Sequence, residues 1–158
     1  MRHPRVLVYE TDGRLAVLLR PLAEQRRWVL HEPRRWRTCC DLLRPGGPSV
    51  FVLRINWEGL PLDSPPADKD TRQRVAELVN RFTMLERVAW LFPDAAVVVV
   101  GDADHASLAD LAWDLGASYV LTAGVRERLP QLVADLMGVP DVRPPAREVS
   151  ERAETDDD

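Results

Sequence analysis

The chain has 158 residues, of which 46% are hydrophobic and 29% charged, and its formal net charge at pH 7 is −4. This length and balance are typical of one globular domain with a tail, and no run of about 18 apolar residues predicts a transmembrane helix. The N-terminal residues enter a strand-like run without an apolar signal segment, so we expect a cytoplasmic protein with no membrane partner.

Five short apolar runs predict strands, and a segment with helical periodicity follows each of them. The predicted strands span residues 5–10, 28–31, 49–55, 95–100 and 118–122. The predicted helices end near residue 26 and span about 34–43, 71–92, 106–115 and 129–137. This β-α order predicts a three-layer α/β fold, with a doubly wound parallel sheet between two layers of helices.

Prolines and capping residues predict the ends of several helices. We expect Pro21 to kink the first helix, Pro33 to open the second, and Asp70 or Thr71 to cap the third. Residues 57–70 form a loop rich in proline and aspartate. Residues 1–138 are the predicted domain, and residues 139–158, proline-rich and then acidic, are a predicted disordered tail.

Cys39 and Cys40 are adjacent in a predicted helix. Neighbouring cysteines rarely bridge each other, so we expect two reduced thiols.

Ligands of open parallel sheets bind beyond the carboxyl ends of the strands. Those ends are predicted at residues 9–12, 54–58, 101–105 and 122–124. Any chemistry is therefore expected among these segments.

Two motifs resemble the receiver domains of two-component response regulators. The run GASYVLTAG at 116–124 is similar to that family's GADDYLTKP, and PSVFVLR at 48–54 is similar to its PDLVLLD. The resemblance covers about residues 5–138. It implies a flavodoxin-like (βα)5 fold with strand order 2-1-3-4-5 and a role in bacterial two-component signalling.

The phosphorylation site that the resemblance implies is degenerate. A working receiver has an acidic pair that binds magnesium, a phosphoacceptor aspartate, a hydroxyl, a lysine and a switch aromatic. The corresponding residues here are Glu10 and Thr11 for the acidic pair, Arg54 for the phosphoacceptor, Gly101 for the hydroxyl, Ala123 for the lysine and Val120 for the aromatic.

Arg54 cannot accept a phosphoryl group as the family's aspartate does, because a guanidinium is a permanent cation and not a nucleophile. We expect Arg54 to pair with Glu10 or Asp12 and to fill the space of both metal and lysine, with no cofactor or metal bound. The alternative is an alignment slip that leaves Arg54 as a solvated charge. Even a slip provides no aspartate at this strand end.

Residues 101–105, GDADH, gather acids and an imidazole at a strand end. A metal site would need further ligands from elsewhere. The alternative is that Asp102 or Asp104 caps the fourth helix and His105 lies on the surface.

Charge is unevenly distributed along the chain. Residues 1–54 contain eleven arginines and five carboxylates, whereas the remainder is acidic. Within the basic part, arginines alternate with Trp28 and Trp36 over residues 26–37, a pattern typical of nucleic-acid or nucleotide binding. The alternative is that Trp28 lies in the core and the arginines are solvated.

No catalytic motif is present, and Ser107 beside His105 does not by itself make a catalytic triad. An enzyme on a flavodoxin-like scaffold is therefore the least favoured reading.

The favoured function is a non-phosphorylatable receiver-like domain, or pseudo-receiver, that binds a protein partner or a second copy of itself. The resemblance places the partner face on the fourth helix, fifth strand and fifth helix, with Trp113, Tyr119, Arg126 and Arg128. These residue types are enriched at binding hot spots. The third helix and the 57–70 loop, with Trp57 and Trp90, form a second candidate face.

Overall fold

The computed structural model describes residues 4–44, 49–60 and 64–137. Strands and helices alternate along them. The elements are β1 (Arg5–Tyr9), α1 (Arg14–Arg26), β2 (Val29–His31), α2 (Trp36–Leu43), β3 (Ser49–Ile55), α3 (Lys69–Leu91), β4 (Ala95–Gly101), α4 (Ala106–Asp114), β5 (Tyr119–Leu121), the 3-10 helix η1 (Ala123–Arg128) and α5 (Leu129–Met137).

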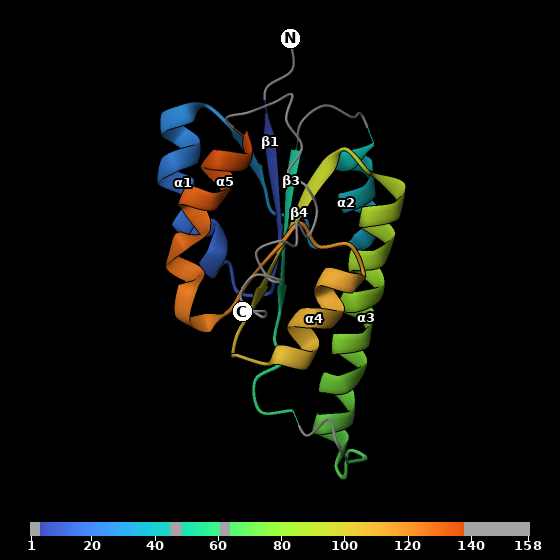
Figure 1. Ribbon diagram of the computed structural model, residues 1–158. Helices are drawn as coiled ribbons and strands as arrows, with labels where there is room; N and C mark the ends of the chain where they lie inside the picture. Colours follow the sequence, from blue (N-terminus) through green and yellow to red (C-terminus); the bar gives the residue numbers. More distant parts are fainter. Residues whose placement is uncertain (1–3, 45–48, 61–63, 138–158) are drawn as a thin grey trace, which may run out of the picture.

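The strands form one sheet in the order β2-β1-β3-β4-β5, and every neighbouring pair is parallel. Helices α1 and α5 cover one face of this sheet, and α2, α3 and α4 cover the other (Figure 1). The predicted three-layer fold and strand order are confirmed.

Side chains of the central strands alternate between the two faces, as the two-residue period of a strand requires. Phe51 and Leu53 of β3 belong to the hydrophobic cluster under α2, α3 and α4, whereas Val50 and Val52 belong to the cluster under α1 and α5. Because both faces are covered, these strands are apolar at nearly every position. The register also brings the ends of β1, β3 and β4 to the same edge of the sheet.

The starts of two helices differ from the sequence-based predictions. Helix α2 begins at Trp36 rather than after Pro33, since Arg35 still has extended backbone angles. Helix α3 begins at Lys69, and its cap is Asp68, whose carboxylate accepts from the Thr71 amide at 2.7 Å. The predicted caps were wrong because an N-cap must combine extended backbone with an acceptor that reaches the first turn.

The cap of α4 is also different. The Nδ1 atom of His105 accepts from the Leu108 amide at 3.3 Å. The expectation that Asp102 or Asp104 caps this helix was wrong, and Asp102 is thereby available for other contacts. Helix α1 continues through Pro21 to Arg26.

Cys39 and Cys40 are free thiols on α2, as expected. Burial raises the pKa of the Cys39 thiol to about 12. The predicted tail, residues 139–158, lies outside the described residues. No helix in the described part of the chain is long and apolar enough to cross a membrane.

Candidate functional site

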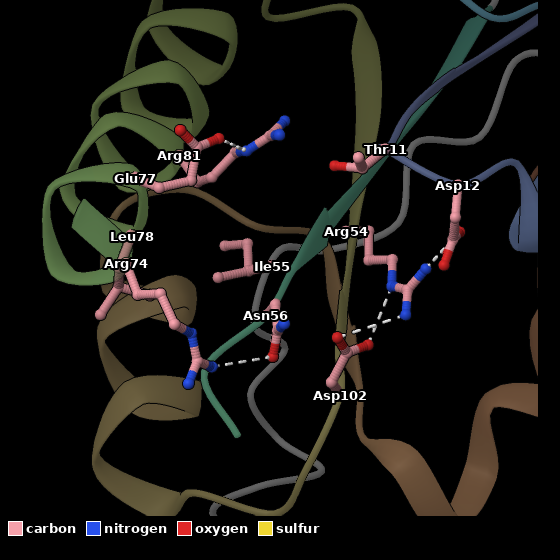
Figure 2. Close-up of a pocket in the computed structure, with 10 residues that line it drawn as sticks. All are labelled: Thr11, Asp12, Arg54, Ile55, Asn56, Arg74, Glu77, Leu78, Arg81 and Asp102. Carbon is pink, nitrogen blue, oxygen red and sulfur yellow. Dashed lines mark hydrogen bonds and ion pairs between the residues drawn. The ribbon is translucent and has the colours of Figure 1, made fainter. Parts of the chain in front are cut away.

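Charged side chains from three strand ends meet at the carboxyl edge of the sheet. Arg54 is the penultimate residue of β3, Asp12 follows β1, and Asp102 follows β4. Figure 2 shows the Arg54 guanidinium between the two carboxylates. The parallel sheet therefore brings together groups that are distant in sequence.

Arg54 donates hydrogen bonds from all three guanidinium nitrogens to these two carboxylates. Its Nε donates to Asp102 Oδ1 at 2.9 Å, its Nη2 to Asp102 Oδ2 at 3.3 Å, and its Nη1 to Asp12 Oδ1 at 2.5 Å. The fork on Asp102 is the bidentate geometry in which guanidinium–carboxylate pairs are strongest. The Arg54 side chain is only 13% exposed, so the pairing with Asp12 expected from the sequence is present and Arg54 is not a solvated charge.

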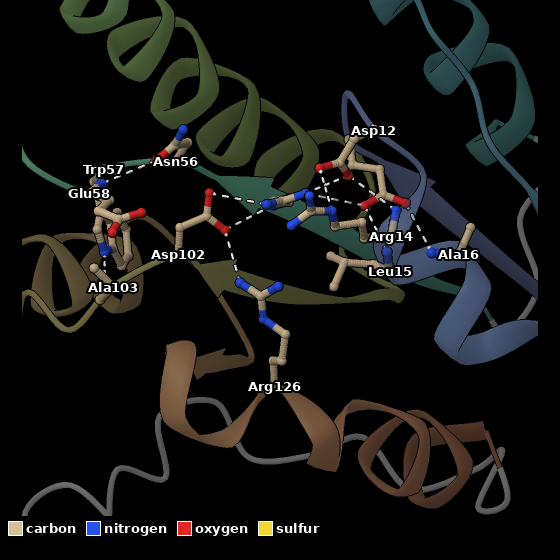
Figure 3. Close-up of polar contacts among 12 residues, drawn as sticks. Asp12, Arg14, Leu15, Ala16, Asn56, Trp57, Glu58, Asp102, Ala103 and Arg126 are labelled. Atoms are coloured by element: carbon tan, nitrogen blue, oxygen red, sulfur yellow. Dashed lines mark hydrogen bonds and ion pairs between the residues drawn. The ribbon is translucent and has the colours of Figure 1, made fainter.

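A second arginine joins Asp102 from the other side. Arg126 of η1 donates from Nη2 to Asp102 Oδ1 at 3.2 Å, as Figure 3 shows. The sequence placed Arg126 on a partner face, but the structure brings its guanidinium to Asp102. The long arginine side chain explains the difference, since its charged end lies far from its backbone. Arg54, Asp12, Asp102 and Arg126 together form an ion cluster.

Glu10 has a different role from the one expected. Its carboxylate accepts from the amides of Leu15 and Ala16, both at 2.9 Å, and lies 3.9 Å from Arg54 Nη1. The N-cap of α1 is Gly13, which has no side chain to accept these donors. Glu10 therefore stabilises the start of α1 and makes only a peripheral contact with Arg54.

Gly101 lies where the resemblance places a hydroxyl, and the neighbouring space is filled by an indole. A Cβ atom on Gly101 would lie 2.2 Å from Cζ2 of Trp57. Trp57 is 1% exposed and donates its indole N–H to the carbonyl of Ala103. The prediction of Trp57 on an exposed face was wrong, because the indole packs against the core and stacks with Phe82.

Three further residues correspond to the degenerate site, and Val120 among them is the middle residue of β5. Thr11 is exposed between β1 and Asp12 and lines a pocket of 340 Å³ beside the ion cluster (Figure 2). Ala123 is the first residue of η1, shortly after β5.

The ion cluster shifts the titration of its members. Burial lowers the pKa of Arg54, but hydrogen bonds and charge from Asp102 and Asp12 outweigh it and raise the pKa overall. For Asp12 burial raises the pKa, yet hydrogen bonds from the Arg14 amide and Arg54 lower it overall. Arg54 is therefore a fixed cation at any physiological pH.

These residues do not fit the magnesium ion that a working receiver uses. The carboxylates of Asp12 and Asp102 are hydrogen-bonded to Arg54, whose positive charge lies where a cation would need ligands. Among the described residues, no three of histidine, cysteine, aspartate and glutamate converge on one point. His105, the imidazole of the 101–105 segment, caps α4 instead.

The residues predicted for a partner face lie on α4, β5 and η1. The rings of Trp113 on α4 and Tyr119 on β5 meet edge to face with centroids 6.2 Å apart, and both residues are half-buried. Arg128 is exposed on η1. All four residues thus lie on α4, β5 or η1, but the side chain of Arg126 contacts Asp102.

The arginine- and tryptophan-rich segment does not form one stacking surface. Trp28 packs against the cluster under α1 and α5, whereas Trp36 packs against the cluster on the opposite face of the sheet. Stacking of successive bases requires aromatic rings on one continuous surface, so the structure does not favour the nucleic-acid alternative.

No protein-family model and no curated protein sequence matches the chain. Solved structures of similar shape do exist. A response regulator from Thermotoga maritima superposes with a TM-score of 0.60 at 15% identity, over 87% of this chain and 99% of that one. The signal receiver domain of a Luxo repressor protein from Vibrio parahaemolyticus has a TM-score of 0.60 at 16% identity, over 97% and 98% of the two chains.

A third similar structure is the beryllofluoride-activated NtrC4 receiver domain dimer, with a TM-score of 0.58 at 18% identity over 85% of this chain and 96% of that one. Identities this low show the fold alone. The chain therefore has the fold of response regulator receiver domains.

Proposed function

We propose that this chain is a receiver-like domain that works in signalling or regulation without being phosphorylated, by binding a protein partner. The observation that carries the proposal is the state of Arg54. It lies near the end of β3, where the sequence resemblance puts the phosphoacceptor, and it donates from all three nitrogens to Asp12 and Asp102.

The chemistry follows from that arrangement. Formation of an acyl phosphate needs a carboxylate nucleophile that approaches the phosphorus atom, and a guanidinium provides none. The nearest carboxylates, Asp12 and Asp102, are engaged by Arg54 and, for Asp102, also by Arg126. Attack by either would require the ion cluster to break first.

The partner face is proposed on α4, β5 and η1. The edge-to-face pair of Trp113 and Tyr119 supplies aromatic surface, and the exposed Arg128 on η1 supplies a cation. These residue types dominate hot spots because they combine large contact area with directional hydrogen bonds. A second copy of the chain is one candidate partner, since one structure of the same fold is described as a dimer.

Incubation with acetyl phosphate and magnesium, followed by intact-protein mass measurement, tests the first half of the proposal. We expect no added phosphoryl group in the wild type. An adduct that hydroxylamine removes would mean that an acyl phosphate forms, and this would overturn the proposal.

A photo-crosslinking amino acid tests the second half. Introduced in place of Tyr119 in source cells, it should yield a discrete crosslinked product whose yield is unchanged by acetyl phosphate. The matched control is Val17, which is 58% exposed on α1, the helix on the opposite face of the sheet from α4 (Figure 1). Equal products at both positions, or none at Tyr119, would contradict the proposed face.

A further inference from the structure

The pocket beside the ion cluster contains an arginine that lacks part of its hydrogen bonding. This pocket of 340 Å³ lies between the ends of β1 and β3 and the first half of α3 (Figure 2). Its volume is at the small end of the range for ligand sites, about 300–1,000 Å³. Ile55 and Leu78, both buried, supply apolar lining.

Arg81 reaches into this pocket from α3. Its guanidinium lies over the ring of Tyr9, 4.5 Å from the ring centroid, and its Nε donates to Glu77 at 2.8 Å. These two contacts fix the plane of the guanidinium. Figure 2 shows its terminal nitrogens pointing away from α3 and toward the ends of β1 and β3.

One of those terminal nitrogens is buried without an acceptor. The Arg81 side chain is 13% exposed, and Nη1 has no hydrogen-bond partner within the described residues. A buried charged donor without an acceptor costs free energy, and such groups in native structures call for an explanation. A ligand oxygen would satisfy it after a small shift of the side chains that enclose this nitrogen.

A second arginine, about two helical turns earlier on α3, lines the same pocket. Arg74 donates from Nη2 to the carbonyl of Glu58 at 2.7 Å and to Asn56 Oδ1 at 3.4 Å. These neutral acceptors position the guanidinium but do not neutralise it, and no carboxylate of the described residues forms an ion pair with it. The carboxylates of the pocket are committed elsewhere, Asp12 and Asp102 to Arg54 and Glu77 to Arg81.

We propose that this pocket binds a small organic anion, with oxyanion groups (carboxylate or phosphate) held by Arg81 at one end and Arg74 at the other and an apolar part against Ile55 and Leu78, which lie between them (Figure 2). Guanidinium groups suit such oxyanions because their paired N–H donors match two oxygens. Arg54 takes no part, because its donors are already used. On the proposed function, in which the domain is not phosphorylated, the site would give it a reversible ligand input.

Titration of the ¹⁵N-labelled full chain tests this proposal, with the arginine Nε–Hε resonances as the readout. Inorganic phosphate and succinate are added separately against sodium chloride of equal ionic strength. We expect saturable shifts at Arg81 and Arg74, and none at Arg54, with at least one probe. The probe that binds assigns the headgroup as phosphate or carboxylate.

Variants make the test specific. Arg81→Met and Arg74→Ala should each weaken binding by about tenfold or more, which is the loss expected for a charged hydrogen bond. Arg74 is exposed, so its variant is expected to fold even if Arg81→Met does not. Arg72→Met, at an exposed position of α3 outside the pocket, is the control and should bind as the wild type does.

Glu77→Gln should change the affinity for the anion in the opposite direction. It removes the negative charge beside Arg81 and keeps an acceptor for Nε, so it should bind the anion more tightly. Binding should need no magnesium and should be lost on dialysis, which distinguishes it from an acyl phosphate. The proposal is overturned if neither probe shifts Arg81 and Arg74, or if Arg74→Ala binds as tightly as the wild type.

Discussion

Replacement of Arg54 by methionine is expected to destabilise the fold substantially. The change keeps an unbranched apolar side chain and removes the charge that Asp12 and Asp102 share. Asp102 is 8% exposed, so it would be left as a nearly buried carboxylate with Arg126 as its remaining partner. An uncompensated buried charge is among the larger costs that a single substitution can create.

The magnitude can be worked from the burial of the three side chains. Removal of one partner from a buried ion pair costs about 3–5 kcal/mol. The low end applies here, because Arg126 stays 3.2 Å from Asp102 and the 39% exposed Asp12 can be hydrated. We therefore expect a loss of about 3 kcal/mol, which for a domain of this size lowers the Tm by about 10 °C.

Urea denaturation followed by circular dichroism measures this loss. Arg128→Met, an exposed change on η1, is the matched control and should stay within about 0.5 kcal/mol of the wild type. The double variant Arg54→Met/Asp102→Asn should be about 2 kcal/mol more stable than the sum of the two losses predicts. A loss under about 0.5 kcal/mol for Arg54→Met, or strict additivity, would refute the reasoning.

The effect should also depend on pH. Burial raises the pKa of Asp12, but hydrogen bonds from the Arg14 amide and from Arg54 lower it overall. Because the pKa of Asp12 is lower in the folded state, the stability that ionised Asp12 contributes is fully present above its pKa in the unfolded chain, about 3.9. This contribution is lost as the pH falls through its pKa in the folded protein. The difference in stability between the wild type and Arg54→Met should therefore be constant near neutral pH and shrink below about pH 4. A difference that grows in acid would contradict the assignment.

Two further outcomes follow from the packing. Gly101→Ala should lower the free energy of unfolding by about 1–3 kcal/mol, since its Cβ would lie 2.2 Å from the Trp57 indole. Thermal denaturation should show this loss of stability. Adding Trp57→Leu to the same chain should make the loss caused by Gly101→Ala smaller. In thiol labelling at pH 8, Cys39 should react far more slowly than the partly exposed Cys40, because burial raises the Cys39 pKa to about 12; equal rates in the folded protein would contradict its burial.

The fold was predictable because its signals are local and repeated. Each strand is an apolar run, and each is followed by a helix whose apolar stripe marks the face that packs on the sheet. The helix caps were less predictable. Asp68 and Asp70 are chemically identical, and only the backbone angles of the folded chain select Asp68.

The site was predictable in part. The sequence aligned Arg54 with Asp12 at adjacent strand ends, and the structure pairs them. It did not predict that Asp102 is the main partner of Arg54, because aspartate after a strand also suits a helix cap. Nor did it predict the inward turn of Arg126 or the burial of Trp57, since both depend on side chains that meet only in the folded protein.

The central claim is that Arg54 closes the strand-end site as part of a fixed ion cluster. The exchange of its Nε–Hε proton with water, measured by NMR during a magnesium titration, tests this claim most directly. The account predicts a slowly exchanging Arg54 resonance that magnesium and acetyl phosphate leave in place. A resonance that exchanges rapidly, or that shifts saturably with magnesium, would show an open site and contradict the claim.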